Sequence, residues 1–278
     1  MSVLDLMLPS AAACIVLAGI LCYFGTHIVA RQVYFADLAL AQMAAMGTAW
    51  GLAWGHEMGT PGSYLYSFGA TLVGAVVFAW SRRFERKVAQ EAVIGTTYVC
   101  AMAFMLLIMS HAPGGLDDIK GLLEGNLLTT GWSAIGSAAL LSIGVGILHF
   151  VFRKQLFVIS FHAGRMRGAK LNMPLWDFLF FATFGLVVTA SVRIAGVLVV
   201  FSLLVVPAVI AAIFARTVSS RLALGWLLGV LLSVTGVALS SPLILDAATG
   251  PTVVMVLGAA LFLLGLGANL LKKGGIRA

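Results

Sequence analysis

Two polar side chains near the start of an apolar, small-residue segment are the first candidates for chemistry. Asp37 and Gln42 lie in YFADLALAQMAAMGTAWG, residues 34–51, a segment long enough to cross a membrane. Polar groups at such depth are costly, which makes them candidates for a transport path. On a helix the two side chains point about 140° apart. The alternatives are that Asp37 caps the helix or pairs with Arg31, and that Gln42 hydrogen-bonds a neighbouring helix.

The histidines and cysteines give a weaker indication of metal binding. No two of the five histidines are three or four residues apart, so the sequence holds no helical pair of metal ligands. His56 beside Glu57 is the best candidate for transient capture of a metal cation at the outer face. The alternative is an ordinary surface histidine. Cys14, Cys22 and Cys100 lie in apolar runs without a CxxC motif and are expected to be small hydrophobic residues.

The motifs of soluble enzymes are missing from the sequence. It contains no Walker A, GxSxG or HExxH motif, and no GxGxxG followed by an acid. We therefore expect a chain that is not an enzyme and does not hydrolyse ATP itself. Active transport would then draw its energy from another subunit or from an ion gradient.

Composition decides which elements must position these residues. Of the 278 residues, 61% are hydrophobic and only 10% are charged, and the mean hydropathy is +1.07. A chain of this composition has more apolar surface than the core of one soluble domain can bury. A span needs roughly 20 apolar residues to cross about 30 Å of hydrocarbon. The sequence therefore predicts an all-α polytopic membrane protein, a single transmembrane domain over residues 1–278. About nine spans are expected, near 5–29, 35–56, 62–81, 90–110, 129–152, 174–192, 194–215, 222–244 and 251–271.

The basic residues orient this nine-span arrangement. All of the 17 Lys and Arg residues except Lys120 and Arg193 fall on one side of it. Because cytoplasmic loops collect Lys and Arg, the N-terminus is predicted outside and the C-terminus in the cytoplasm. The net charge of +7 is then a property of the inner loops, and no nucleic-acid partner is expected.

The segment VISFHAGRMRGAKLNMP, residues 158–174, is too polar to span a membrane and too short to fold alone. It is predicted to form a short helix along the cytoplasmic surface. One interpretation is a basic loop held by anionic membrane lipid. The other is a docking element for a soluble cytoplasmic partner, and the residues alone leave both open.

Three stretches carry a resemblance to a known family. The first runs from Ala195-Gly196-Val197-Leu198-Val199-Val200 to Pro207-Ala208, and the second is LSSPLILDAATGPTVV, which contains Asp246, Gly250 and Val253. The third is the acid-x-x-IG segment that opens EAVIGTTYVCAMAFMLLIMS, with Arg31 at a basic position after the first span. Together they resemble the ABC-type zinc/manganese/iron permease family over most of the chain.

The resemblance implies partners and a mode of energy coupling. It implies a homodimer or a paired permease, two cytoplasmic ATP-binding subunits that carry the ATP, and an extracytoplasmic solute-binding protein. It also favours docking for the basic loop, as a coupling helix over about 160–170 that includes Ser160, Phe161, His162, Arg165 and Arg167. No covalently bound cofactor is implied, and a divalent metal would be the cargo.

The chain departs from the family pattern in the opening segment. Family members typically carry an acid four residues before a histidine, and both are thought to line the metal path. Here Leu38 occupies the acid position and Gln42 the histidine position, with Asp37 one residue early. An amide oxygen is a poorer ligand than an imidazole for borderline transition metals, and the one-residue shift turns the carboxylate by about 100°.

The leading hypothesis is the membrane-spanning permease subunit of an ATP-driven importer in a bacterial cytoplasmic membrane. Its cargo would be a divalent transition metal, zinc first and then manganese or iron, with Asp37 and Gln42 in the translocation path. The alternatives are an ABC permease for a metal chelate or small organic nutrient, a gradient-driven carrier and a membrane scaffold.

Overall fold

The protein is described from a computed structural model that covers residues 3–57, 60–84, 87–110, 127, 130–161 and 172–273. Within these ranges all regular secondary structure is helical, which confirms the all-α prediction. Seven of the described helices are long and apolar enough to cross a membrane, so this is a multi-pass membrane protein. They are α1 (Val3–Arg31), α3 (Pro61–Ser81), α4 (Gln90–Met109), α6 (Trp132–Val151), α8 (Met173–Phe214), α9 (Val218–Leu239) and α10 (Thr249–Lys273).

The long helix α8 accounts for two of the predicted spans. It has 42 residues and is interrupted at Gly196, whose backbone angles are φ 79° and ψ 161°. These angles are essentially restricted to glycine, and they break the helix close to the predicted division at Arg193. With α8 counted as two and α2 (Ala36–Ala53) included, the described residues form nine helices near span length, consistent with the predicted number.

Helix α2 stands apart from the seven apolar helices because of its composition. Its 18 residues combine Asp37 and Gln42 with many Ala and Gly, and most of them are buried. A Cβ atom at Gly47 would meet the backbone carbonyl of Tyr66 in α3. This glycine therefore lets the two backbones approach closely, as small residues do between membrane helices.

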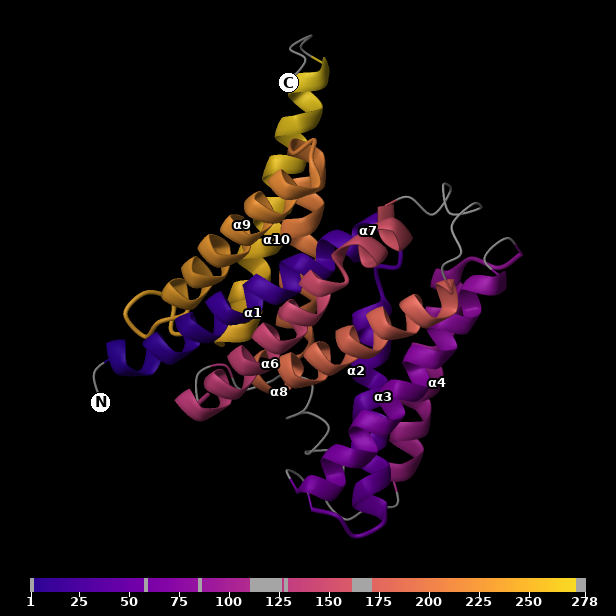
Figure 1. Cartoon of the computed structure of the whole chain (residues 1–278). Coiled ribbons are helices and arrows are strands. Elements are labelled where there is room, and N and C mark those ends of the chain that lie inside the picture. Colours follow the sequence, from indigo (N-terminus) through magenta and orange to yellow (C-terminus); the bar gives the residue numbers. More distant parts are fainter. Residues whose placement is uncertain are drawn as a thin grey trace. The chain divides into compact units, whose positions relative to one another are not determined.

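The structure divides into two compact units, each described here by itself. Unit 1 comprises 1–29, 124–142 and 194–278, and unit 2 comprises 30–123 and 143–193. In unit 1 the Cys22 thiol lies within hydrogen-bonding distance of the carbonyl oxygens of Leu203, at 3.7 Å, and Gly225, at 3.3 Å, which brings α1 together with α8 and α9. In unit 2 the helices α2, α3 and α4 lie side by side (Figure 1).

The start of α9 differs from its prediction for a local reason. The helix begins at Val218 rather than near residue 222, because Thr217 and Ser220 form a reciprocal capping box. Each side chain satisfies a backbone N–H group of the first turn. The polar residues before the apolar run therefore belong to the helix.

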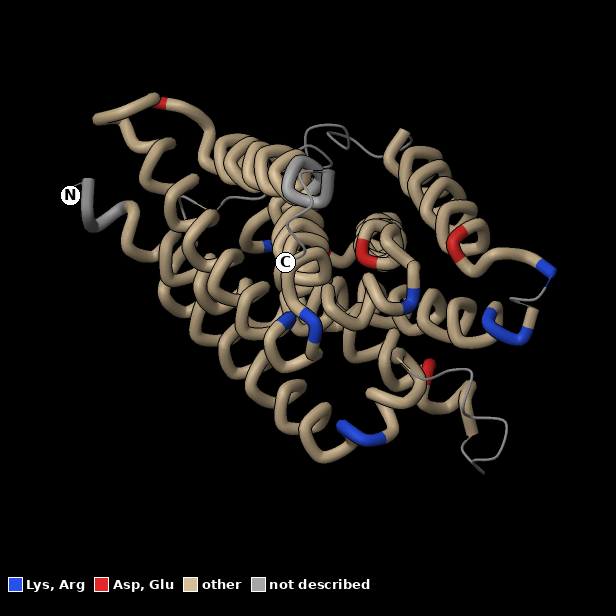
Figure 2. Tube along the Cα trace, turned by 90° about the horizontal axis from the view of Figure 1, so that it is seen from above, with Lys and Arg blue, Asp and Glu red and all other residues tan. Residues whose placement is uncertain are grey.

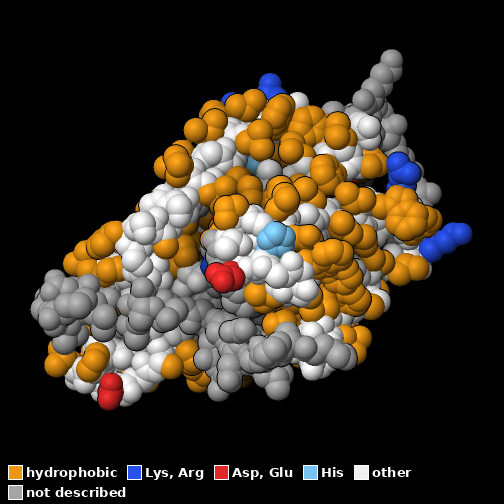
Figure 3. All heavy atoms as spheres, turned by 90° about the horizontal axis from the view of Figure 1, so that it is seen from below, with side chains coloured by type: hydrophobic (Ala, Val, Ile, Leu, Met, Phe, Trp, Pro, Cys, Tyr) orange, Lys and Arg blue, Asp and Glu red, His pale blue; other side chains and the backbone are white. Residues whose placement is uncertain are grey.

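The outward-facing side chains are mainly apolar. Charged positions are sparse along the helices (Figure 2), and hydrophobic side chains predominate on the face drawn in Figure 3. Leu140, Phe150 and Phe262 are 73%, 66% and 70% exposed, respectively. Apolar surface on this scale suits contact with lipid tails rather than water.

Candidate functional site

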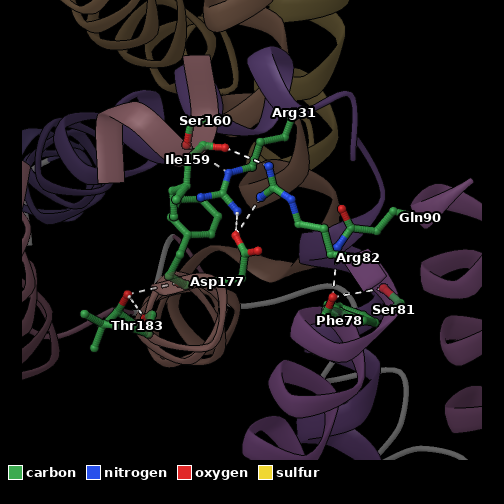
Figure 4. A network of polar contacts seen from close by, with 11 residues as sticks. Arg31, Phe78, Ser81, Arg82, Gln90, Ile159, Ser160, Asp177 and Thr183 are labelled. Carbon is green, nitrogen blue, oxygen red and sulfur yellow. Dashed lines mark hydrogen bonds and ion pairs between the residues drawn. The ribbon is translucent and has the colours of Figure 1, made fainter. Parts of the chain in front are cut away.

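A buried ionic cluster in unit 2 joins four elements at their ends (Figure 4). Asp177 lies in the second turn of α8, Arg31 is the last residue of α1, and Arg82 follows α3 directly. The Asp177 Oδ1 atom accepts a hydrogen bond from Arg31 Nη1 at 2.9 Å and one from Arg82 Nη1 at 2.6 Å. The carboxylate side chain is 1% exposed and that of Arg31 is 2% exposed. We call this set, with Ile159 and Ser160, the Asp177 cluster.

Both arginines also hold the end of the short helix α7 (Arg153–Phe161). Arg31 Nε donates to Ser160 Oγ at 2.9 Å, and Arg82 Nη2 donates to the carbonyl oxygen of Ile159 at 2.8 Å. The last carbonyl groups of a helix have no partner within the helix, and a cation there is favoured by the helix dipole. The cluster therefore fixes the C-terminal turn of α7 against three other elements.

The position of Arg82 is set by the capped end of α3. The carbonyl oxygen of Phe78 in the last turn accepts hydrogen bonds from Ser81 Oγ and from Gln90 Nε2 of α4, each at 2.9 Å. A 3-10 turn, Arg82–Phe84, then takes the chain out of the helix. Because Arg82 opens this turn, its side chain can reach both α8 and α7.

The surroundings of the cluster compensate for burying charge. The Arg31 guanidinium lies over the Phe180 ring with its Cζ atom 3.8 Å from the ring centroid, a favourable cation–π geometry. One turn further along α8, Thr183 Oγ1 is 2.7 Å from His149 Nε2 of α6. Asp177 Oδ2 has no hydrogen-bond partner within the described residues, so a single carboxylate oxygen serves both guanidinium groups.

Asp37 and Gln42 are both buried in α2, with 2% and 3% exposure. Their Oδ1 and Oε1 atoms have no hydrogen-bond partner in the part of the chain that the structure describes. The N-cap of α2 is Phe35, with no side-chain capping bond, and Arg31 is paired with Asp177. Two buried oxygen atoms are thus left to accept a hydrogen bond or bind a cation, while their place in a path remains a prediction.

The predicted outer pair lies at an exposed turn. His56 packs on Tyr66 with ring centroids 5.4 Å apart and lines a largely apolar cavity of about 530 Å³. The Glu57 carbonyl oxygen accepts a hydrogen bond of 2.7 Å from Thr60, the N-cap of α3. Across the described ranges no three His, Cys, Asp or Glu residues are grouped to hold a metal ion. Metal capture by His56 and Glu57 stays a prediction.

The predicted coupling segment is only partly described. Ser160 and Phe161 are the last residues of α7, where Phe161 stacks on Phe157 at 4.8 Å between centroids. His162, Arg165 and Arg167 lie outside the described residues, within 162–171. The described part of the expected surface helix thus belongs to α7, which starts at Arg153.

A comparison with known protein families shows which family this chain belongs to. The model of the ABC 3 transport family matches residues 3–268. The chain belongs to the ABC 3 transport family. The family resemblance seen in the three sequence stretches is thereby confirmed.

Individual relatives of this ABC 3 chain have low sequence identity to it, but the alignments with them cover most of its length. It is 25% identical over 268 residues to the high-affinity zinc uptake system membrane protein ZnuB of Haemophilus influenzae. This alignment covers 94% of this chain and 97% of ZnuB. It is 24% identical over 207 residues to the manganese transport system membrane protein MntB of a Synechocystis species, and this alignment covers 74% of this chain and 65% of MntB. A solved structure, PsaBC from Streptococcus pneumoniae in complex with Fab, aligns with a TM-score of 0.76 at 18% identity over 95% of this chain and 91% of that chain, which shows a shared fold.

The family resemblance had directed attention to α2 and the loop after α7, and it missed the Asp177 cluster in this ABC 3 chain. One signal was present in the sequence, since Asp177 stands alone at the start of a predicted span on the basic side. A carboxylate at that position needs a cationic partner. The sequence could not say which of the many inner arginines supplied it.

Proposed function

We propose that the chain is the membrane-spanning permease subunit of an ATP-driven importer for divalent transition metal ions. The observation that carries this proposal is the ABC 3 family match over residues 3–268. Zinc and manganese systems among the relatives, ZnuB and MntB, support the class of cargo. Zinc is the first candidate because the match to ZnuB runs through nearly the whole of both chains, and manganese and iron follow.

The path for the ion would use the buried oxygen atoms of α2. Asp37 and Gln42 each present one such atom without a partner within the described residues. Weak ligation by a carboxylate and an amide suits a conducting site, because an ion that crosses must also be released. His56 and Glu57 would take part at the outer entrance, where both are exposed.

The partners follow from the ABC class of transporter. Two cytoplasmic ATP-binding subunits would dock on α7 and the loop after it, and an extracytoplasmic solute-binding protein would deliver the ion. A homodimer of this chain would form the pore in the bacterial cytoplasmic membrane. The N-terminus would lie outside and the C-terminus in the cytoplasm, since the Lys and Arg residues then gather inside.

The test is reconstitution of the whole complex. The chain would be co-expressed with an ATP-binding subunit and a solute-binding protein encoded beside it and placed in liposomes. Uptake of zinc, manganese and ferrous iron would then be measured with and without ATP. We expect ATP-dependent accumulation of at least one ion, zinc most strongly. If a stable complex hydrolysed ATP yet moved none of them, the departures at Leu38 and Gln42 would indicate a chelated metal as cargo.

A further inference from the structure

We propose that Asp177 is the positioning residue that joins the coupling segment to the membrane helices. Through the two arginines, its carboxylate would hold the end of α7 in register with the ends of α1, α3 and α8. A displacement of α7 by a docked ATP-binding subunit would then reach all three helix ends together. The inference rests on the proposed function and deepens it by naming the connection within this chain.

The geometry makes Asp177 the common member of two linked contacts. One runs from Asp177 through Arg31 to Ser160, and the other runs from Asp177 through Arg82 to the Ile159 carbonyl group. Each guanidinium group donates one hydrogen bond to the carboxylate and another, from a different nitrogen, to α7. Because these donors sit in a rigid planar fork, fixing one contact orients the other. Removal of the Asp177 charge would therefore loosen both arginines at once.

The chemistry of the cluster favours a positioning role over simple stabilisation. Replacing a buried ion pair by apolar residues of similar volume is often neutral or stabilising, so a buried ion pair is by itself weak evidence for a role in stability. Charge-assisted hydrogen bonds do give direction as well as energy. Asp177 and Arg31 are almost completely buried, where solvent cannot replace the lost contacts.

The two linked contacts also lie directly before the loop that the resemblance assigns to docking. Ile159 and Ser160 are within the last three residues of α7, and the segment 162–171 follows. Leu156 and Ile159 of the same helix are fully buried. The end of α7 is thus held by packing and by the ionic cluster, and the cluster links it to the ends of α1, α3 and α8.

The experiment compares Asp177→Asn with the unchanged chain in the full reconstituted complex. Asparagine keeps the shape of the side chain and removes its charge. We expect ATP hydrolysis to continue while zinc taken up per ATP hydrolysed falls about tenfold, a usual size for coupling between sites. Asp177→Glu should recover part of the loss. Ser191→Ala is the matched control, because Ser191 is also buried in α8 but its hydroxyl donates to the Val187 carbonyl oxygen of its own helix, and its uptake per ATP should stay unchanged.

A double-mutant cycle distinguishes a shared connection from independent damage. If Arg82 and Asp177 act together, Arg82→Gln combined with Asp177→Asn should lower uptake per ATP little further than either change alone. Additive losses would contradict the proposal. Equal uptake per ATP in the Asp177→Asn and unchanged complexes would overturn it.

Hydrogen exchange provides a readout that does not depend on transport. In the full chain in nanodiscs, we expect Asp177→Asn to raise amide exchange of residues 153–161, while Ser191→Ala leaves it unchanged. Unaltered exchange in Asp177→Asn would also overturn the inference, whether or not the complex transports metal. If the unchanged complex showed no ATP-driven uptake, the proposed function would fail and the exchange measurement would still decide the role of Asp177. Should Asp177→Asn not fold, Arg82→Lys, which keeps a charge but loses the planar fork, replaces it in both measurements.

Discussion

Two groups of buried polar side chains in unit 2 differ in how their hydrogen-bonding capacity is used. Around Asp177, one carboxylate oxygen and two guanidinium groups are joined by short hydrogen bonds. In α2, Asp37 and Gln42 each keep a buried oxygen atom with no partner within the described residues. A buried polar atom without a partner costs free energy unless something binds it. Asp177 Oδ2 is also such an atom within the described residues, but the carboxylate to which it belongs is held by two guanidinium groups. We expect the two groups to have different tasks: attachment of α7 for the Asp177 cluster and, under the proposed function, contact with cargo for Asp37 and Gln42.

Substitution of Gln42 tests its place in the path. Gln42→Ala removes the amide oxygen and should lower ATP-dependent zinc uptake about tenfold, the effect of roughly 1.4 kcal/mol of lost stabilisation. Gln42→His supplies an imidazole, which suits zinc better than manganese, and should raise the ratio of zinc to manganese uptake. The measurement is ion uptake into proteoliposomes.

The control for Gln42 is Thr48→Ala in the same helix. Thr48 is also buried, but its hydroxyl donates to the Ala44 carbonyl oxygen of its own helix, so uptake should be unaffected. If Gln42→Ala left both the uptake rate and the choice of metal unchanged, Gln42 would be a packing residue.

Among the elements, α8 depends most on one backbone conformation. Gly196 interrupts its 42 residues at a positive φ, so this stretch forms two helices of span length. The sequence predicted a division there because a single charge, Arg193, interrupts the hydrophobic residues. The physical cause of the break is instead the glycine three positions later, which alone tolerates these backbone angles without strain.

Gly196→Ala should therefore destabilise the bundle. A side chain in this region of φ and ψ costs about 1–3 kcal/mol, and the thermal unfolding temperature of the purified chain in detergent should fall accordingly. Gly258→Ala in α10 is the matched control, since a Cβ atom there meets open space at an ordinary helical φ and alanine favours helix. Equal unfolding temperatures for the two variants would show that the break at Gly196 is not needed.

For the molecule as a whole, hydropathy and charge predict how the chain crosses the membrane. The described helices match the predicted spans closely in position, and most Lys and Arg residues fall on one side of that arrangement. The orientation within the membrane follows from the charges alone. It therefore needs a direct chemical test.

Cysteine labelling can decide the orientation with two positions in unit 1, at opposite ends of α9. In a chain whose three cysteines are replaced by serine, Leu243→Cys lies after α9 and Ser219→Cys lies in its first turn; both positions are exposed. We expect a membrane-impermeant maleimide to label Leu243→Cys in spheroplasts and Ser219→Cys only after permeabilisation. The reverse pattern would place the C-terminus outside.

The sequence by itself determined the membrane class, the positions of the spans and the family, because each depends on patterns along the chain: the length of apolar runs, the placement of charges and short motifs. It also singled out Asp37 and Gln42, since polar groups stand out in an apolar segment. Only the tertiary structure decided that Arg31 pairs with Asp177, 146 positions away, and that both arginines hold the end of α7. Several inner arginines were equally plausible partners by composition, and hydrogen bonds act only within about 3 Å. The packing of α1, α3, α7 and α8 in space, which no local pattern encodes, selected the pair.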